Sequence, residues 1–358
     1  MTSKPARPLP ARRSRRLIGS VAARLTLSYT LVIAVIGVVF LAAGVWLIGN
    51  RIVAEAQEKV GFDLNSAREI YYGRLRHISD VVRLTGDRTL LIQAVFSGDT
   101  TRASSALNAV RMREGLDVLT VTDREGNVIL RTSNPTRLGD DQSRDRLVSV
   151  VLSTGQPLAA TMLVEAENLA LESPGLAEQA RIDLIDTPRA RPRPETEVAD
   201  GLMLKAAAPV LDDNGQLLGV VYGGTLLNRD TGIVDTIKQT VYQNLQYRGN
   251  DIGTATIFED DIRVSTNVIG ADGSRAIGTR AAQDVYDKVV GRGETWVGRA
   301  YVVNNWYITA YEPIRDLNLK IVGMLYVGIL EQKYVDLRQQ MVVVFAAITL
   351  VGTLTGMG

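Results

Sequence analysis

The sequence of 358 residues contains no cysteine and a single histidine, His77. Without cysteine the chain forms no disulfides, and one histidine is too few for a transition-metal site with the usual ligands. A Gly-x-x-x-x-Gly-Lys-Ser/Thr phosphate loop and a Gly-x-Ser-x-Gly nucleophile elbow are also absent from the sequence. We therefore predict no catalytic residue, no metal and no cofactor in this chain.

Acidic residues are absent from the first 24 positions, which hold seven basic side chains. Charge-free apolar runs follow from Leu25 to Asn50 and again from Met341 to the last residue. Each run is long enough to cross a bilayer at a rise of about 1.5 Å per residue. A basic flank before an apolar span predicts a cytoplasmic N-terminus, so the region from about residue 51 to residue 340 is expected outside the cytoplasm.

Two other interpretations of the N-terminus compete with a membrane anchor. Nucleic-acid binding is not favoured, because no aromatic residue is interleaved with the basic ones. Cleavage of a signal peptide would use the small residues Leu41-Ala42-Ala43-Gly44. The apolar run continues to Trp46 and Ile48, however, and is longer than a usual signal core. We expect the span to be retained.

An internal repeat organises the region between the two apolar runs. Pro209, Gly219, Tyr222 and Gly224 recur 104 residues later as Pro313, Gly323, Tyr326 and Gly328. One structural unit is therefore predicted to occur twice. Periodicity and turn chemistry predict that each unit has the order strand, strand, helix, then three strands. The stretch from about 165 to 200 carries four prolines among charges and is predicted to be a partly irregular exposed insertion.

A long helix is predicted between the first apolar run and the first unit. Its small and apolar residues recur at spacings of three and four, as one helix face requires: Val53, Ala56, Val60, Leu64, Ala67, Tyr71, Leu75, Ile78 and Val82. This face either packs on its own domain or forms a dimer seam. Further helices are expected at 103–112, 145–152, 230–247, where the two units join, and 281–290.

The order of elements resembles the double Cache sensor regions of bacterial transmembrane receptors, over roughly residues 50 to 335. The second unit is similar to the Cache 3/Cache 2 fusion family. Four runs carry that similarity: Thr256-Ile257-Phe258, Arg263-Val264-Ser265-Thr266-Asn267, Asp272-Gly273-Ser274-Arg275-Ala276-Ile277-Gly278-Thr279-Arg280 and Trp306-Tyr307-Ile308-Thr309-Ala310-Tyr311-Glu312-Pro313-Ile314-Arg315. The resemblance implies an α+β fold with two tandem PAS-like modules, each with an antiparallel sheet, on a long N-terminal helix flanked by two transmembrane helices.

The first unit resembles the Cache type of dicarboxylate and citrate sensor kinases. Arg131-Thr132-Ser133-Asn134-Pro135, followed by Leu138-Gly139, is similar to their Arg-x-Ser-His-Pro and Ile-Gly pattern, with Asn134 in place of the usual histidine. Lys205 stands where that family has a basic carboxylate ligand. The resemblance implies a ligand site at Arg131, Ser133, Asn134 and Lys205 for a di- or tricarboxylate. Lactate-like monocarboxylates and amino acids remain open, as does an orientation of Arg131 and Lys205 into solvent.

Other polar and aromatic groups are weaker candidates. Arg263, Tyr307 and Tyr311 on the second unit are secondary site residues, and Tyr307 shares a strand face with Tyr311 while Trp306 faces the other way. Core packing or a dimer surface competes with an aromatic-lined pocket for these rings. The pairs Asp140-Asp141 and Asp212-Asp213 and the run Glu259-Asp260-Asp261 are expected to be solvated turns rather than calcium sites. His77 is expected on a helix surface.

The expected function is ligand sensing outside the cytoplasm and signalling across the bilayer. The resemblance favours a two-component sensor histidine kinase of the bacterial inner membrane that acts as a homodimer, with its kinase core and its response-regulator contacts past Gly358. A methyl-accepting chemotaxis receptor and a ligand-free membrane-anchored assembly protein are the alternatives. The predicted divisions are a basic arm (1–24), a first span (25–49), a helical region (50–113), a membrane-distal module (114–229), a linking helix (230–250), a membrane-proximal module (251–335) and a second span (336–358).

Overall fold

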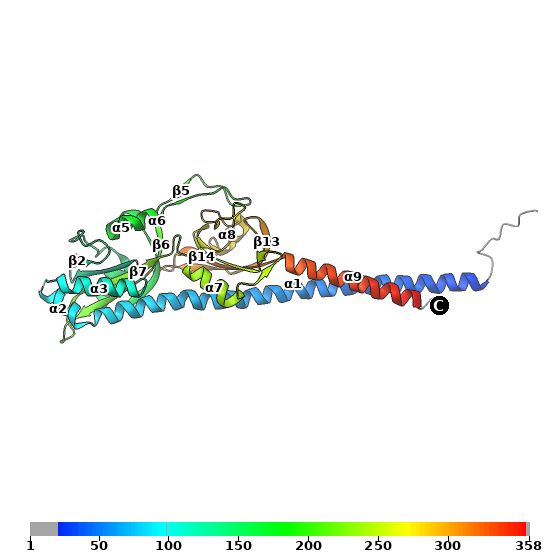
Figure 1. Ribbon diagram of the computed structural model, residues 1–358, viewed down its shortest axis with the longest axis horizontal. Helices are drawn as coiled ribbons and strands as arrows, with labels where there is room; N and C mark the ends of the chain where they lie inside the picture. The colour runs from blue at the N-terminus through cyan, green and yellow to red at the C-terminus, as the bar shows by residue number, and fades with distance from the viewer. Residues whose placement is uncertain (1–20, 98, 356–358) are drawn as a thin grey trace, which may run out of the picture. The chain divides into compact units, whose positions relative to one another are not determined.

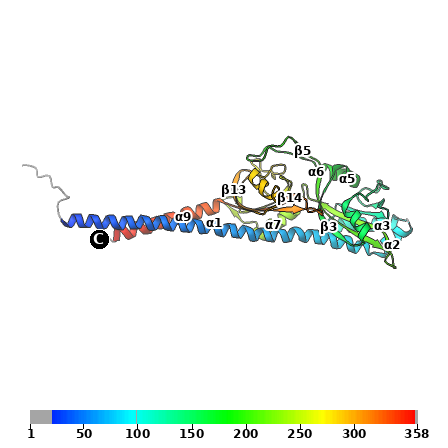
Figure 2. The same ribbon diagram turned by 180° about the vertical axis from the view of Figure 1, so that it is seen from behind.

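The computed structural model describes residues 21–97 and 99–355, so most of the predicted basic arm lies outside the described residues. The chain divides into two compact parts, one formed by Ala54–Lys333 and the other by Met1–Val53 with Tyr334–Gly358. The two repeated units, called the first and second modules below, both lie within Ala54–Lys333. The fold is α+β, as predicted (Figures 1 and 2). The helices are α1 (Val21–Gly86), α2 (Thr89–Ser97), α3 (Thr101–Arg113), α4 (Arg146–Thr154), α5 (Ala166–Glu172), α6 (Pro174–Ala180), α7 (Gly232–Tyr242), α8 (Gln283–Val289) and α9 (Gln332–Thr355).

Each module is built on a five-stranded antiparallel sheet. The first sheet has the order β2-β1-β7-β6-β3 and the second has the order β11-β10-β14-β13-β12, so the two share one topology. The first comprises β1 (Val118–Asp123), β2 (Val128–Arg131), β3 (Leu158–Val164), β6 (Gly201–Leu211) and β7 (Leu217–Leu226). The second comprises β10 (Gly253–Glu259), β11 (Ile262–Thr266), β12 (Trp296–Val302), β13 (Asn305–Arg315) and β14 (Ile321–Leu330). Two short ribbons pair β4 (Ile182–Asp183) with β5 (Glu197–Val198) and β8 (Gln246–Tyr247) with β9 (Asn250–Asp251).

The register of the strands confirms the internal repeat. Pro209 is paired with Val220 between β6 and β7, and Pro313 is paired with Met324 between β13 and β14. Both partners are displaced by the same 104 residues. The repeated glycines also serve one purpose, because a Cβ atom on Gly219 would overlap the carbonyl oxygen of Thr122, and a Cβ atom on Gly323 that of Phe258. Glycine lets the neighbouring strand approach at these two points.

The predicted face of the long helix is confirmed. Its residues from Ala56 to Val82 are buried, whereas Val53 is 45% exposed. Tyr71 of α1 makes a buried hydrogen bond to Thr161 of β3, and Arg68 pairs with Glu312 of β13. Along this stretch the face therefore packs on its own domain, against both sheets. Apolar burial of this kind is the main source of stability available to a chain without disulfides.

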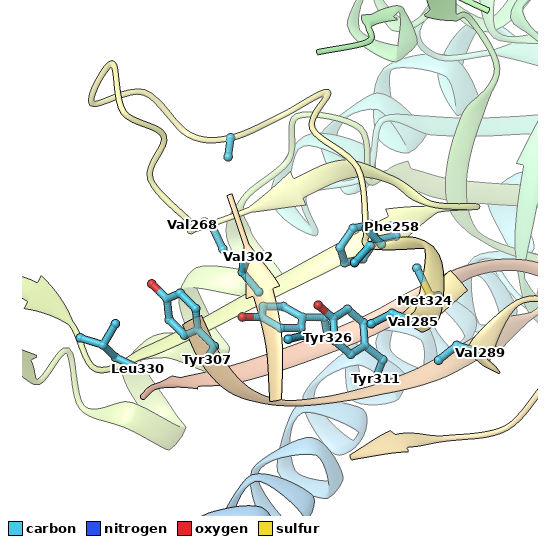
Figure 3. Packing of buried hydrophobic residues seen from close by; sticks show 14 residues of the cluster. Phe258, Val268, Val285, Val289, Val302, Tyr307, Tyr311, Met324, Tyr326 and Leu330 are labelled. Atoms are coloured by element: carbon cyan, nitrogen blue, oxygen red, sulfur yellow. The ribbon is translucent and has the colours of Figure 1, made fainter. Parts of the chain in front are cut away.

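The other sheet faces carry the module cores. In the first module, Leu147 of α4, Leu169 of α5 and Leu176 of α6 pack with Tyr222 of β7. In the second, Val285 and Val289 of α8 pack with aromatic side chains of β10, β13 and β14 (Figure 3). Asp145 accepts hydrogen bonds from the backbone of Leu147 and Val148 and so caps the start of α4.

The insertion is irregular at residues 184–196, as predicted, but it is not exposed throughout, and the linking helix is shorter than predicted. Within residues 165–200, which were predicted to be a partly irregular insertion, α5 and α6 bury Leu169 and Ala180, and Pro174 occupies the start of α6, where its fixed φ is compatible with a helix. The linking helix ends at Tyr242 rather than at 247. Gln243 and Asn244 both have positive φ, which a helix does not continue, and Leu245 is exposed. Helix α2 was not predicted.

Two helices are long and apolar enough to cross a membrane by length and composition, with mean hydropathies of 2.9 for α1 and 1.4 for α9 in their apolar windows. Within the compact part that contains them both, the apolar segments of α1 and α9 lie side by side. Gly37 and Gly44 of α1 face Thr349 and Phe345 of α9, respectively. Small residues at such contacts let helix backbones approach closely.

A buried carboxylate lies where the two modules meet. Glu259 at the end of β10 helps to line a cavity of about 400 Å³ with Asp200, Arg193 and Lys320. Burial, aided by the charge of Asp200, outweighs a weak hydrogen bond from Asn228 and raises the pKa of Glu259 to about 7. The charge at this junction therefore changes near neutral pH.

Gly323→Ala is predicted to destabilise the protein, because its Cβ atom would overlap backbone that cannot move away cheaply. The cost should be about 1–3 kcal/mol, seen as a melting temperature lower by several degrees. Gly61→Ala in α1 is the matched control, since a Cβ atom there meets nothing within 4 Å. That variant should be neutral or more stable by up to about 1 kcal/mol. Equal effects of the two substitutions would contradict this account of the repeated glycine.

Glu259 is predicted to make stability fall as the pH rises. Its folded pKa of about 7 lies above the ordinary value of 4.5, so the folded state holds the proton more tightly. The contribution is fully favourable below pH 4.5 and is lost between pH 4.5 and 7, by at most about 3 kcal/mol. Glu259→Gln should flatten this part of the melting-temperature profile. The exposed Glu178→Gln should leave the profile unchanged, and an unaltered slope in Glu259→Gln would refute the assignment.

Candidate ligand-binding site

The second module contains a buried arginine without a carboxylate partner. Arg263 lies on β11 and is 1% exposed. Its Nη1 atom donates to the hydroxyl of Thr279 at 2.8 Å and to the carbonyl of Arg280 at 3.3 Å, and its Nε atom is buried without a partner. Among the residues that the structure describes, Arg263 has no ion-pair partner. The guanidinium is thus an uncompensated positive charge.

The surroundings of Arg263 are aromatic. Its guanidinium lies 4.9 Å from the ring centroid of Phe258, the cross-strand neighbour. Burial lowers the pKa of Arg263, and its electrostatic interactions with Tyr311, Tyr326 and Tyr307 oppose the shift. An unpaired buried charge is costly, and its cost is relieved when an anion pairs with it. The guanidinium therefore carries an unpaired positive charge that is able to pair with an anionic group.

Three tyrosines lie side by side along the sheet in Figure 3. The ring centroids of Tyr311 and Tyr326 are 4.7 Å apart, and burial raises the pKa of Tyr307 to about 12. The hydroxyls are therefore protonated and able to donate hydrogen bonds. Tyr307 and Tyr311 belong to the core, as one alternative predicted, and Trp306 lies on the opposite face against Tyr301. Tyr326 was not named as a site residue, although its place in the repeat marked it.

In the first module the predicted arginine is already neutralised. Arg131 on β2 is 1% exposed, so the alternative that it points to solvent is wrong. It makes two hydrogen bonds to Asp140, at 2.8 and 3.0 Å, and one to Glu172 at 3.3 Å. Burial alone would lower the pKa of Arg131, but the hydrogen bond to Asp140 and the charge of Glu172 raise it. The ordinary solvated role expected for Asp140 is also wrong.

Lys205 is likewise buried and paired. Its Nζ atom donates to Asp145 at 2.5 Å and lies 4.6 Å from the ring centroid of Tyr222. Although burial would raise the pKa of Asp145, the charge of Lys205 holds it below its ordinary value. Tyr222 in turn donates to Glu172 at 2.6 Å. Glu172 thus links Arg131 to Tyr222, and Lys205 lies over the ring of the same tyrosine, in a set with two cations and three carboxylates.

The two remaining predicted residues follow Arg131 along the chain. Asn134 donates to the backbone carbonyl of Leu171 at 3.0 Å, which ties the loop after β2 to α5. The hydroxyl of Ser133 is buried without a partner. Neither has a hydrogen bond to Arg131 or Lys205 in the described contacts. Glu172 and Asp145 were missed because their pairing partners lie 41 and 60 residues away in sequence.

The turn after β10 is not a solvated carboxylate cluster as expected. Asp261 is fully buried and accepts hydrogen bonds from Arg191, Arg193 and Arg280. Its neighbour Asp260 also binds Arg191 and Arg193. Among the described residues no group of three metal-type side chains converges. His77 lies on the helix surface as predicted, 3.5 Å from Glu114.

A cavity of about 730 Å³ lies elsewhere, at the junction of α1, α6, β7 and α7 with the segment that precedes β1. Arg74, Asp117, Thr225 and Asp230 contribute to its lining, and none of the predicted site residues does. Burial and the charge of Asp230 raise the pKa of Asp117, against a hydrogen bond from the backbone of Leu226. Two carboxylates beside a single guanidinium do not suit an anion.

Comparisons with known proteins place part of the chain in a family. Residues 225–341 match the family model of single cache domain 3. No curated protein matches the sequence. The periplasmic domain of Vibrio cholerae LuxQ is similar, with 13% identity, coverage of 76% of this chain and 99% of that chain, and a TM-score of 0.46.

Two further solved structures are similar at the same distant level. The sensor domain of the V. cholerae histidine kinase DctB has 12% identity, covers 76% of this chain and 96% of its own, and has a TM-score of 0.44. The ligand-binding domain of the Pseudomonas aeruginosa amino acid chemoreceptor PctB, in complex with L-Gln, has 14% identity, coverages of 78% and 91%, and a TM-score of 0.35. With scores below 0.5, these likenesses assign no ligand and no signalling output. The match over residues 225–341 identifies this part of the chain as a Cache domain, which confirms the resemblance to Cache sensor regions.

Proposed function

We propose that this chain is the extracytoplasmic ligand-sensing and transmembrane signalling region of a two-component sensor histidine kinase, and that it detects a small organic anion such as a carboxylate. The domain divisions given above, a homodimeric assembly in the bacterial inner membrane and a cytoplasmic response regulator as partner belong to the same proposal. The Cache domain supports the sensing role. The buried, uncompensated charge of Arg263 is the observation that carries the ligand class.

The second module suits an anion better than the first. Arg131 and Lys205 already contact Asp140, Glu172 and Asp145, so a carboxylate ligand would have to displace a carboxylate of the protein. Arg263 has no such competitor, and its Nε atom is available as a donor. We therefore place the primary site at Arg263 with Tyr307 and Tyr311. The set of Arg131, Ser133, Asn134 and Lys205 stays a prediction that requires rearrangement of the first module.

The neighbours of Arg263 favour a ligand with one anionic group. The guanidinium offers a planar pair of donors that fits one carboxylate, and tyrosine hydroxyls provide neutral donors for a second oxygen. The same core cluster contains several small apolar side chains, among them Ala276, Ala281 and Val285. A carboxylate on a short apolar body matches this lining, whereas a second or third carboxylate would be buried without a cation.

The proposed signal passes along the chain from the second sheet into α9. β14, the central strand between β10 and β13, ends at Leu330 next to the first residue of α9, Gln332. Glu331 between them donates its backbone N–H to Trp306 and pairs with Arg299, so this junction is fixed to the sheet. A shift of the sheet on ligand binding would therefore pass into α9. The ligand biases two packings only by its difference in affinity, about 1.4 kcal/mol for each tenfold ratio.

Arg263→Gln is predicted to abolish stabilisation by carboxylates without destabilising the unliganded protein, since it removes an unpaired buried charge. In a thermal-shift panel that includes acetate, lactate and succinate, the wild type should gain about 2.7 kcal/mol at a ligand concentration of 100 times Kd. Arg299→Gln, which removes an exposed arginine of the same sheet, is the control and should respond like the wild type.

Undiminished stabilisation of Arg263→Gln by the same carboxylate would move the site away from the second module. A wild-type protein that gains no stability from any anion of the panel would refute the ligand class. A large loss of stability of Arg263→Gln without ligand would instead make this arginine a structural residue.

Single introduced cysteines test the proposed topology, because the natural chain has none. Asn214→Cys in the exposed turn after β6 should react with a membrane-impermeant maleimide in intact cells whose outer membrane is permeabilised. Ser14→Cys in the basic arm should react only after lysis. Labelling of position 14 before lysis, or protection of position 214, would contradict an extracytoplasmic sensor region.

A further inference from the structure

One segment of the first module extends to the second module's candidate site. Residues 184–196, here called the strap, leave the insertion after β4 and return to it at β5, which pairs with β4. Figure 1 shows the strap beside the label β5, extending from α6 towards α8. It forms several hydrogen bonds with the loop of the second module that leads into α8, residues 276–283.

Two backbone hydrogen bonds and one to a side-chain hydroxyl join the strap to this loop. The N–H of Ile185 donates to the carbonyl of Gly278 at 2.9 Å, and the N–H of Gln283 donates to the carbonyl of Arg189 at 2.8 Å. Between them, the N–H of Arg280 donates to the hydroxyl of Thr187 at 3.0 Å. The strap is therefore paired with the loop along its length rather than touching it once.

Arginines fasten the strap at its far end. Arg191 donates to Asp261 at 3.2 Å and to Asp260 at 2.7 Å, and Arg193 donates to the same two aspartates at 3.1 and 3.2 Å. Arg280 of the loop shares Asp261 with them, at 2.6 Å. One fully buried carboxylate thus holds strap and loop together. Charge-assisted bonds of this kind are about twice as strong as neutral ones.

Stacking adds to this fastening. The guanidinium of Arg191 lies 4.1 Å from the ring centroid of Tyr286 on α8, and that of Arg189 lies 4.8 Å from the centroid of Trp306 on β13. Cation–π contacts at these distances favour the closed arrangement. Both rings belong to the second module, so the strap contacts that module at two elements, α8 and β13.

The loop under the strap is also the part of the chain that holds Arg263. The backbone of Arg263 exchanges hydrogen bonds with Thr279 and Gly278, at 2.9 and 3.0 Å, and its side chain donates to Thr279. Because Arg263 is 1% exposed, a ligand reaches it only when neighbouring chain moves. The neighbouring strand β10 is fixed in the sheet. The loop of residues 276–283, which leads into α8, is in contact with Arg263 along the free edge of β11.

We propose that the strap gates the Arg263 site: fastened to Asp260 and Asp261, it keeps the loop closed over the arginine, and its release admits the anion. This inference rests on the proposed function of Arg263 as the ligand-binding residue. Because the strap is part of the first module's insertion, between α6 and β6, any rearrangement of that module changes the strain on the gate. Binding in one module and the state of the other are then coupled reciprocally.

The gate is tested by access to Arg263 in the full-length protein in detergent, without any ligand. Phenylglyoxal modifies accessible arginines, and mass spectrometry locates the modified residues. In Arg191→Ala/Arg193→Ala, Arg263 should react at least about tenfold faster than in the wild type, the factor that loss of charge-assisted hydrogen bonds produces. Hydrogen exchange at residues 278–283 should accelerate by the same factor, while exchange in β10 and β14 is unchanged.

Arg181→Ala is the matched control, because Arg181 belongs to the same insertion but pairs with Glu197 at an exposed position. It should leave the reactivity of Arg263 at the wild-type value. If the double variant does not fold, Arg193→Ala alone serves, since Arg191 and Arg280 then still bind the aspartates. Wild-type reactivity of Arg263 in the folded strap variant overturns the gate. The result is independent of the carboxylate panel, so a failure of the proposed ligand site would be seen separately.

Discussion

The fold of the second module depends on how it accommodates one positive charge. Arg263 on β11 is buried between Phe258 and the loop at Thr279, and among the described residues no carboxylate pairs with it. In the first module the corresponding problem is solved internally, because Asp140 and Glu172 neutralise Arg131. The two modules thus share a topology and a register but differ in charge balance. That difference, rather than the fold, distinguishes the neutralised network around Arg131 from the unpaired charge of Arg263.

Two carboxylates, Asp261 and Glu259, lie close to Arg263 in the sequence, but neither forms an ion pair with it. Asp261 is fully buried, yet three arginines already surround it. It therefore stabilises the strap and the loop instead of Arg263. Glu259, a few residues away, is held partly protonated near neutral pH by burial. The turn after β10 therefore lies at the junction of the modules, and its aspartates bind both the strap and the loop over Arg263.

Much of the fold was predictable from the sequence because it depends on local periodicity. The helical spacing from Ala56 to Val82 identified the buried face of α1, and the repeat of Pro209 and Pro313 anticipated the shared register. Ion pairing was not predictable, since it depends on contacts across the fold. Glu172 meets Arg131 only because α5 packs over the first sheet, within a segment that was expected to be exposed and partly irregular. The resemblance to dicarboxylate sensors favoured Arg131 over Arg263, because a sequence motif carries no information on which of the two arginines is already paired.

A site with an uncompensated charge has a thermodynamic advantage for a sensor. Under the proposed function, the unliganded protein bears the desolvation cost of Arg263, and the structure that closes over this residue is destabilised until an anion binds. Ligand binding then contributes more free energy to the closed state than to the open one, and only such a difference shifts a conformational equilibrium. A site whose arginine is already paired, such as Arg131 with Asp140, would exchange one carboxylate for another with little net gain. Under the proposed function, the same charge that limits the stability of the second module would give an anionic ligand its influence over β14 and α9.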